Sequence, residues 1–273
     1  MILVNGKSQN TVSVRDRGFT YGDGLFETIA IRDQQPLLWN LHWGRLVAGC
    51  ERLKITCPEE SLLLDDIEQL LAQADDKYRH CSVIKLIVTR GVGGRGYQYD
   101  PAMDSTRIVM LSGWPTYRGT EKDKGIRTKL CDTRLSMQPL LAGIKHLNRL
   151  EQILARSEWS KDEITEGVML DANNNIIEGT MSNLFFVDHQ ECLVTPSLKQ
   201  CGVAGVQREH VLNIAEEKGY QTKITEVPVN KLAQFNEVFA TNSLIGIWPV
   251  IAIEDQRFAI GPVTKSLQAA IND

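Results

Sequence analysis

The spacing of apolar residues along this chain changes repeatedly between the period of a strand and that of a helix. Near the N-terminus, short apolar runs stand on either side of Asn5-Gly6, a turn signal typical of a two-residue hairpin. A polar turn at residues 33–35 follows the next apolar run in the same way. The pattern therefore predicts two hairpins, the first from residues 1–4 and 9–14 and the second from residues 27–32 and 36–38.

Apolar residues three and four positions apart indicate amphipathic helices in both halves of the chain. They predict helices over residues 41–53, 61–74, 146–160 and 205–218, with Gly219 as the stop signal of the last one. Short apolar runs bounded by turn residues are typical of strands. The expected strands are residues 83–89, 107–111, 126–132, 168–170, 176–177, 184–187, 192–195, 238–240 and 248–253.

A polar stretch at residues 115–124, which contains proline, glycine and several charges, is typical of a connection between domains. A chain of 273 residues is long enough for two modest domains with apolar cores. We therefore expect an α+β protein, with a small N-terminal α/β domain at residues 1–114 and a larger β-rich domain at residues 125–273.

Composition and charge argue against several classes of function, including nucleic-acid binding and membrane proteins. The net charge is −4 and the pI is near 5.8, so the chain has no overall positive field for nucleic acid or an acidic membrane. An anionic substrate would have to be met by a few local arginines. No apolar run approaches the ~20 residues of a membrane span, and the N-terminus lacks the pattern of a signal peptide. The six cysteines show no metal-like spacing, so we expect free thiols, no metal and a cytoplasmic protein.

One lysine has surroundings that suit covalent chemistry. Lys145 follows the apolar run at residues 140–144 and precedes a predicted helix, in the sequence G-I-K-H-L-N-R-L. Apolar surroundings disfavour the ammonium ion, which lowers the pKa of a lysine and frees its amine to form a Schiff base. The alternative is an ordinary solvated lysine at the start of a helix.

Other segments carry polar groups that suit an anionic, aromatic cofactor. Glu178 stands between an apolar pair and a glycine, where a carboxylate is costly unless it meets a cation such as a protonated pyridine. Glycines at 202 and 205 precede a helix whose first amides could hold a phosphate. Asn242, Ser243 and the planar guanidinium of Arg45 could bind phosphate as well. The alternatives are a solvated glutamate, an ordinary helix start, the end of a strand and a surface arginine.

In this order and at these spacings, the segments resemble the class IV aminotransferase family, whose members are fold type IV enzymes that use pyridoxal 5′-phosphate. The resemblance extends from V-N-G near the N-terminus to I-W-P-V at residues 247–250. It implies a fold like that of D-amino-acid aminotransferases, a homodimer, and a large domain that binds the cofactor. It also implies that Lys145 carries the cofactor as a Schiff base and that Glu178 pairs with its pyridine nitrogen.

The same resemblance implies a set of phosphate contacts, from Arg45, Val206, Gln207, Asn242 and Ser243. The chain departs from the family in one of them. The aminotransferases commonly have Gly-Ile-Thr where this chain has Gly205-Val206-Gln207. A hydroxyl contact would then be lost, while the backbone amides would remain.

The glycine-rich stretch T-R-G-V-G-G-R-G-Y at residues 89–97 looks like that of the 4-amino-4-deoxychorismate lyases within this family. This likeness implies a small-molecule substrate, 4-amino-4-deoxychorismate, from which pyruvate is eliminated to give 4-aminobenzoate for folate biosynthesis. Lys145 would act as general base with Thr28 as a helper, and Arg95, Tyr97 and Phe26 would contact the substrate. The alternative for the stretch is a structural surface loop.

Two rival functions stay open at this point. One is a D-amino-acid or branched-chain aminotransferase on the same fold, which would convert the cofactor to its amine form with an amino acid alone. The other is a non-catalytic ligand-binding homologue, which would show no absorption band from a lysine-bound cofactor.

Overall fold

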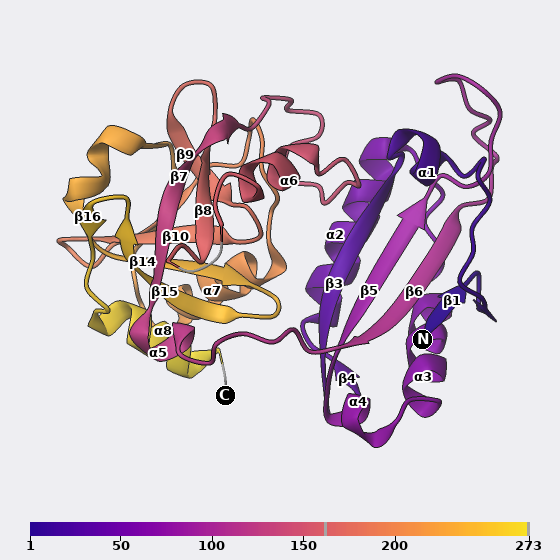
Figure 1. Cartoon of the computed structure of the whole chain (residues 1–273), viewed down its shortest axis with the longest axis horizontal. Coiled ribbons are helices and arrows are strands. Elements are labelled where there is room, and N and C mark those ends of the chain that lie inside the picture. The colour runs from indigo at the N-terminus through magenta and orange to yellow at the C-terminus, as the bar shows by residue number, and fades with distance from the viewer. Residues whose placement is uncertain (161–162, 272–273) are drawn as a thin grey trace. The chain divides into compact units, whose positions relative to one another are not determined.

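The computed structural model describes residues 1–160 and 163–271, and its contacts divide the chain into two compact units (Figure 1). The first unit is Met1–Thr116 together with Ile144–Asn148. The second unit is Tyr117–Gly143 together with Arg149–Asp273. The five residues around Lys145 therefore belong by contact to the first unit, although the sequence on both sides of them belongs to the second.

The first unit is built on a six-stranded antiparallel sheet with the strand order β2-β1-β6-β5-β3-β4. Strands β3, β5 and β6 lie side by side and run the length of the unit (Figure 1). The strands are β1 (Ile2–Val4), β2 (Lys7–Ser8), β3 (Gly24–Arg32), β4 (Gln35–Pro36), β5 (Cys81–Thr89) and β6 (Thr106–Gly113).

A hairpin forms at each predicted turn, but the second strand of the first hairpin is Lys7–Ser8 and lies before the predicted residues 9–14. Asn5 and Gly6 take the positive φ angles of 50° and 77° that a tight hairpin turn needs. The prediction of a strand over residues 9–14 is wrong. Ser13 instead begins a turn, because its hydroxyl accepts a hydrogen bond from the backbone N–H of Arg15 and its carbonyl accepts one from Asp16.

Helices α2 (Trp39–Leu53) and α3 (Glu60–Ala72) confirm the two predicted helices of this unit. Their apolar residues pack with every second residue of the strands, as the alternating burial of Leu25, Ile29 and Ile31 on β3 requires. Two short helices were not predicted, α1 (Arg17–Tyr21) and α4 (Asp76–His80). Five residues are too few to show a helical period.

An edge of β3 pairs with the segment that carries Lys145. The N–H of Phe26 donates to the Lys145 carbonyl (3.0 Å), and the N–H of Leu147 donates to the Gly24 carbonyl (2.9 Å). His146 therefore forms an isolated antiparallel bridge with Leu25 of β3, and the prediction of a helix over residues 146–160 is wrong at both ends. Helix α6 (Leu150–Arg156) begins after this segment.

The second unit contains a ten-stranded mixed sheet. Its order is β12-β11-β10-β14-β15-β7-β8-β9-β13, with β16 paired to β15. The pairs β11/β12, β15/β7 and β7/β8 are parallel. The strands are β7 (Ile126–Arg134), β8 (Glu166–Leu170), β9 (Asn175–Gly179), β10 (Asn183–Asp188), β11 (Leu193–Pro196), β12 (Thr222–Thr225), β13 (Val227–Pro228), β14 (Phe235–Asn242), β15 (Gly246–Ile253) and β16 (Gln256–Arg257).

All the strands predicted for this unit form, and three short ones were missed. β12 is exposed and mostly polar, and β13 and β16 have two residues each, so none shows an apolar period. Besides α6, the helices of this unit are α5 (Glu121–Lys124), α7 (Val206–Glu217) and α8 (Pro262–Ala270), with a 3-10 turn at Val229–Gln234. Helix α5 lies in the stretch 115–124 that was predicted as a connection. Helices α7 and α8 bury Val211 and Leu267 against Phe185 and Phe239, whose rings stack at 4.9 Å.

Within residues 1–160 and 163–271, no helix has both the length and the hydrophobicity to cross a bilayer. All six cysteines, each of which is described, are free in this structure.

Candidate active site

Lys145 lies against the aromatic ring of Phe26. Its Nζ is 4.4 Å from the ring centroid, on the side of β3 that bears Phe26 and Thr28. Lys85 of β5 is directly opposite Thr28 in the register, and its Nζ is 5.4 Å from the same ring. Side chains opposite each other on adjacent strands share a face of the sheet. The structure therefore brings together Lys145, Phe26, Thr28 and a second cation, Lys85, which the sequence did not single out.

Arg45 takes part in a buried charged cluster with Glu27 and His42. Glu27 is 1% exposed and lies on the face of β3 that is packed by α2. Its carboxylate accepts hydrogen bonds from Nε of Arg45 (2.8 Å) and from Nη2 of Arg45, and lies 2.6 Å from Nδ1 of His42. This arrangement holds one edge of the Arg45 guanidinium against the strand. The phosphate contact inferred for Arg45 from the family stays a prediction.

The charge balance of this cluster sets the protonation of its carboxylate. Burial alone would raise the pKa of Glu27, but the charge of Arg45 and the hydrogen bonds from His42 and Arg45 outweigh it and lower the pKa to about 2. Burial lowers the pKa of His42, against the opposing effect of Glu27. Glu27 is therefore ionised near neutral pH and anchors the guanidinium of Arg45.

In the second unit, Glu178 is buried at the end of β9, with 4% of its surface exposed. Its Oε2 accepts a hydrogen bond from the backbone N–H of Val203 (2.8 Å) and is 3.5 Å from the amide nitrogen of Asn183. Arg149 lies close enough to interact electrostatically: burial lowers the pKa of Arg149, and the charge of Glu178 opposes that shift. The sequence predicted a carboxylate that needs partners, and the structure supplies them.

Asn183 connects Glu178 to the start of α7. Its Nδ2 donates to the Val203 carbonyl (2.9 Å), and its Oδ1 accepts from the N–H of Gly205 (3.0 Å), the residue that precedes the helix. Among the described residues, no side chain caps this helix end. The first amides of α7, at Val206 and Gln207, therefore keep the polarity that suits an anion.

The Gly202–Gly205 loop also pairs with the chain that leads to Lys145. The N–H of Gly143 donates to the Gly202 carbonyl (2.8 Å), and the N–H of Ala204 donates to the Gly143 carbonyl (2.9 Å). Gly143 has a φ of 84°, which a residue with a side chain rarely adopts. The loop before α7 is thus fixed both by Asn183 and by the backbone two residues before Lys145.

A second buried carboxylate, Glu166, supports the turn between β9 and β10. It accepts hydrogen bonds from the hydroxyls of Thr180 (2.5 Å) and Ser182 (2.8 Å) and from the backbone of Thr180 (3.0 Å). Burial raises the pKa of Glu166, and these donors oppose the shift. The turn separates Glu178 from Asn183, so Glu166 helps to fix their spacing. The sequence analysis did not identify Glu166, because one glutamate at the start of a strand carries no recognisable signal.

The side chain of Asn242 is engaged in local structure. Its Oδ1 accepts from the N–H groups of Leu244 (2.9 Å) and Ile245 (3.0 Å), and its Nδ2 donates to the Met181 carbonyl (3.0 Å). Asn242 thereby shapes the turn after β14 on which Ser243 lies. Phosphate contacts from either residue stay predictions.

Arg95 and Tyr97 lie on a loop of the first unit. Both side chains are exposed in the single chain, Tyr97 by 85%. The loop connects β5 to β6 and contains four glycines between residues 91 and 96. No cluster of metal ligands occurs among the described residues.

The comparisons with known proteins agree along the whole chain. The model of the family described as amino-transferase class IV matches residues 24–253. An aminodeoxychorismate lyase of Vibrio harveyi is 37% identical, with 100% of both chains covered. The crystal structure of 4-amino-4-deoxychorismate lyase from Pseudomonas aeruginosa is 44% identical with a TM-score of 0.91, covering 100% of this chain and 98% of that one. A D-alanine aminotransferase of Bacillus licheniformis is 27% identical, over 100% of this chain and 96% of its own.

Proposed function

Because this chain belongs to the class IV aminotransferase family, we propose that it is a pyridoxal-phosphate-dependent lyase that splits 4-amino-4-deoxychorismate into 4-aminobenzoate and pyruvate. The observation that carries the chemistry is the position of the Lys145 amine, 4.4 Å from the ring centroid of Phe26, on the side of β3 that also bears Thr28. The branch within the family is supported by the greater identity to the two lyases than to the D-alanine aminotransferase. The fold is that of fold type IV enzymes.

The residues fit the cofactor that the family uses. Lys145 offers the amine that would hold its aldehyde carbon, and the buried carboxylate of Glu178 suits a protonated pyridine nitrogen. The α7 N-terminus, with the amides of Val206 and Gln207, suits its phosphate. Further phosphate contacts would come from Arg45, Asn242 and Ser243.

The bound cofactor would supply an electron sink for the charge left when a proton is removed from the substrate. Glu178 would hold the pyridine proton that keeps this sink effective, and Val203 and Asn183 would keep the carboxylate in place. Lys145 would take the proton from the substrate carbon that bears nitrogen. Thr28, on the same face of the sheet, would assist its transfer.

The substrate carries two carboxylates, and the first unit offers cations for them. Lys85 lies across from Thr28 and beside the ring that Lys145 contacts, so we assign one carboxylate to Lys85. We assign the other to Arg95, with Tyr97 and Phe26 forming apolar contacts to the substrate ring. The carbon–oxygen bond to the enolpyruvyl arm breaks, a ring proton is lost and the arm takes up a proton. The products together contain all the atoms of the substrate, so no oxidant or water is consumed.

Two further properties belong to this proposal. We expect a homodimer, in line with the family resemblance, and sedimentation at micromolar concentration tests this. We expect action in the cytoplasm, where free thiols such as those of all six cysteines persist.

The test uses protein purified with its cofactor. With 4-amino-4-deoxychorismate we expect equal amounts of pyruvate and 4-aminobenzoate, and borohydride should fix the cofactor to the peptide that contains Lys145. Lys145→Ala should abolish both results, whereas Lys199→Ala, at an exposed lysine, should change neither.

Three outcomes would reject the proposal in different ways. Conversion of the cofactor by D-alanine or leucine alone, without pyruvate from aminodeoxychorismate, would indicate an aminotransferase. Attachment of the cofactor to another lysine would contradict the assignment of Lys145. Binding of the substrate without any turnover would indicate a non-catalytic homologue.

A further inference from the structure

We infer that Arg17 and Tyr21 are positioning residues that hold the loop bearing Arg95 and Tyr97 in its substrate-binding form. The inference concerns residues 91–97, named here the glycine loop, and it rests on the proposed function for the role of that loop. Neither Arg17 nor Tyr21 is expected to touch the substrate.

Arg17 is the central contact of the glycine loop. It is 3% exposed, although it lies in the short helix α1 at the surface end of the sheet. Its Nη1 donates to the Gly96 carbonyl (2.9 Å) and its Nη2 donates to the Tyr97 carbonyl (3.3 Å). The guanidinium therefore binds the two backbone groups that follow Arg95 directly. A buried arginine that donates hydrogen bonds to two consecutive carbonyls fixes the path of the backbone between them.

Tyr21 binds the other backbone polar group of Gly96. Its hydroxyl accepts a hydrogen bond from the N–H of Gly96 (2.9 Å), and its ring lies 4.8 Å from the guanidinium carbon of Arg17 and 5.6 Å from the ring of Tyr97. Gly96 has a φ of 85°, a conformation that favours glycine. Both polar groups of Gly96 are thus bound by the segment from Arg17 to Tyr21.

The start of the glycine loop is tied to this segment by backbone contacts. The N–H of Arg17 donates to the Gly91 carbonyl (2.9 Å), and the N–H of Gly93 donates to the Arg15 carbonyl (3.2 Å). A Cβ on Gly93 would lie 3.0 Å from Cδ of Arg17. The loop is consequently held at both ends, and Arg95 lies between the two attachments.

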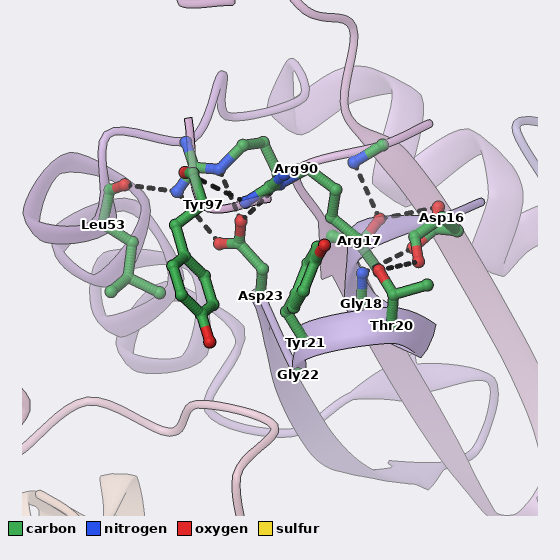
Figure 2. Close-up of polar contacts among 12 residues, drawn as sticks. Asp16, Arg17, Gly18, Thr20, Tyr21, Gly22, Asp23, Leu53, Arg90 and Tyr97 are labelled. Carbon is green, nitrogen blue, oxygen red and sulfur yellow. Dashed lines mark hydrogen bonds and ion pairs between the residues drawn. The ribbon is translucent and has the colours of Figure 1, made fainter. Parts of the chain in front are cut away.

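Asp23 connects Arg17 to the start of strand β3. Its carboxylate accepts hydrogen bonds from Nε of Arg17 (2.9 Å) and from Nε (2.7 Å) and Nη2 (2.9 Å) of Arg90 (Figure 2). Burial alone would raise the pKa of Asp23, but the hydrogen bonds from the two arginines lower it. Asp23 precedes β3, the strand of Phe26 and Thr28, by one residue.

Arg90 completes the connection by reaching the end of α2. Its Nη1 and Nη2 donate to the carbonyls of Lys54 (2.6 Å) and Leu53 (2.8 Å), as Figure 2 shows for Leu53. The ring of Tyr99 covers its guanidinium carbon at 3.7 Å. Two arginines that share one aspartate therefore connect the glycine loop to the start of β3 and to the last turn of α2.

Because of its glycine content, the glycine loop needs contacts such as those of Arg17 and Tyr21 to keep one conformation. Four of its seven residues are glycine, the residue that loses the most conformational freedom when it becomes ordered. A substrate that had to order this loop itself would bind more weakly. Contacts from Arg17 and Tyr21 would order the loop before the substrate binds, so that Arg95 already lies in its binding position.

Tyr21→Phe is the sharpest test, because it removes only the hydroxyl that accepts from Gly96 and keeps the ring over Arg17. With 4-amino-4-deoxychorismate as substrate we expect KM to rise about 3- to 10-fold, as for loss of one hydrogen bond, while kcat stays within twofold. The absorption spectrum of the bound cofactor should be unchanged. Arg17→Lys should raise KM further, and the matched control Tyr220→Phe, in the second unit, should leave both constants unchanged.

A double-mutant cycle separates positioning from general stability. In protein that already carries Arg95→Ala and Tyr97→Ala, Tyr21→Phe should have no further effect on KM, because both groups that it positions are gone. Equal effects of Tyr21→Phe with and without these two side chains would overturn the inference, as would a fall in kcat with KM unchanged.

Hydrogen exchange measures how well the glycine loop is ordered, independently of catalysis. Tyr21→Phe should speed amide exchange across residues 95–97 at least tenfold and leave exchange in β14 unchanged. Unaltered exchange in the loop would refute the positioning role. If the unmodified protein released no pyruvate, the proposed function would fail, and the exchange result alone would still decide whether Tyr21 holds the loop.

Discussion

Replacing Gly205 by alanine tests the connection between Glu178 and α7. The backbone of Gly205 has φ −65° and ψ 136°, which alanine adopts without strain, so the expected effect is purely steric. The added Cβ would lie 2.0 Å from Oδ1 of Asn183, whereas ordinary contact begins at 3.4 Å. Asn183 would have to retreat by roughly 1.4 Å.

This movement breaks two hydrogen bonds and crowds a buried loop. The bonds are those of Asn183 with the N–H of Gly205 (3.0 Å) and the carbonyl of Val203 (2.9 Å), each contributing about 0.5–1.5 kcal/mol. Overpacking costs about 1–3 kcal/mol more. We therefore expect Gly205→Ala to lower the free energy of unfolding by about 2–6 kcal/mol and to weaken cofactor binding, because Val203 also holds Glu178.

Urea unfolding followed by tryptophan fluorescence measures the first effect, and a pyridoxal phosphate titration measures the second. Gly44→Ala is the matched control, because a Cβ at this exposed helical position meets nothing within 4 Å. It should stabilise the protein by about 0.5–1 kcal/mol. If Gly205→Ala unfolded at the same urea concentration as the unaltered protein, Asn183 could not be held in the way described.

Three further changes should act through single groups. Glu178→Gln, which removes the charge but keeps the shape, should lower kcat/KM about 10- to 100-fold in the pyruvate assay; unchanged kcat/KM would exclude an electrostatic role. Because the pKa of Glu27 is lowered from 4.5 to about 2, its contribution to stability is present above pH 4.5 and lost as the pH falls toward 2. Between pH 5 and 2.5 the free energy of unfolding should therefore fall less steeply for Glu27→Gln than for the unaltered protein. Over the full titration of Glu27 the difference amounts to roughly 3 kcal/mol, and parallel curves for the two proteins would refute this. Lys85→Met should raise KM about tenfold with kcat nearly unchanged, whereas the exposed control Lys77→Met should leave KM as it was.

The sequence predicted most of the elements that have a clear apolar period, but the nine-residue helix α8, which buries Val263 and Leu267, was missed. The stripe of α3 is buried as expected at Leu63, Ile67 and Leu70, and every predicted strand of the second unit forms. The short elements α1, β13 and β16 escaped prediction because two to five residues cannot display a period. Residues 146–148 were misplaced in a helix because their conformation is imposed by pairing with β3, which is distant in sequence.

The candidate site was predicted only in part, for a similar reason. The local sequence marked Lys145 and Glu178, since each is a charged residue in apolar surroundings. Glu27 and Lys85 were not marked, because their importance arises from neighbours on α2 and across β3 and β5. Asn183 lies only five residues after Glu178 in the sequence, but only the fold reveals that it joins Glu178 to Gly205.

The pairing of residues 145–147 with β3 has a practical consequence for attempts to divide this protein. The edge of β3 at Gly24 and Phe26 forms backbone hydrogen bonds with residues 145–147. These residues follow Thr116, the last residue of the first unit's N-terminal segment, by almost thirty positions. A truncated polypeptide ending at Thr116 would expose that edge, and unpaired strand edges promote self-association. A synthetic peptide spanning residues 141–150, added during refolding, should compete with this aggregation by restoring the missing pairing.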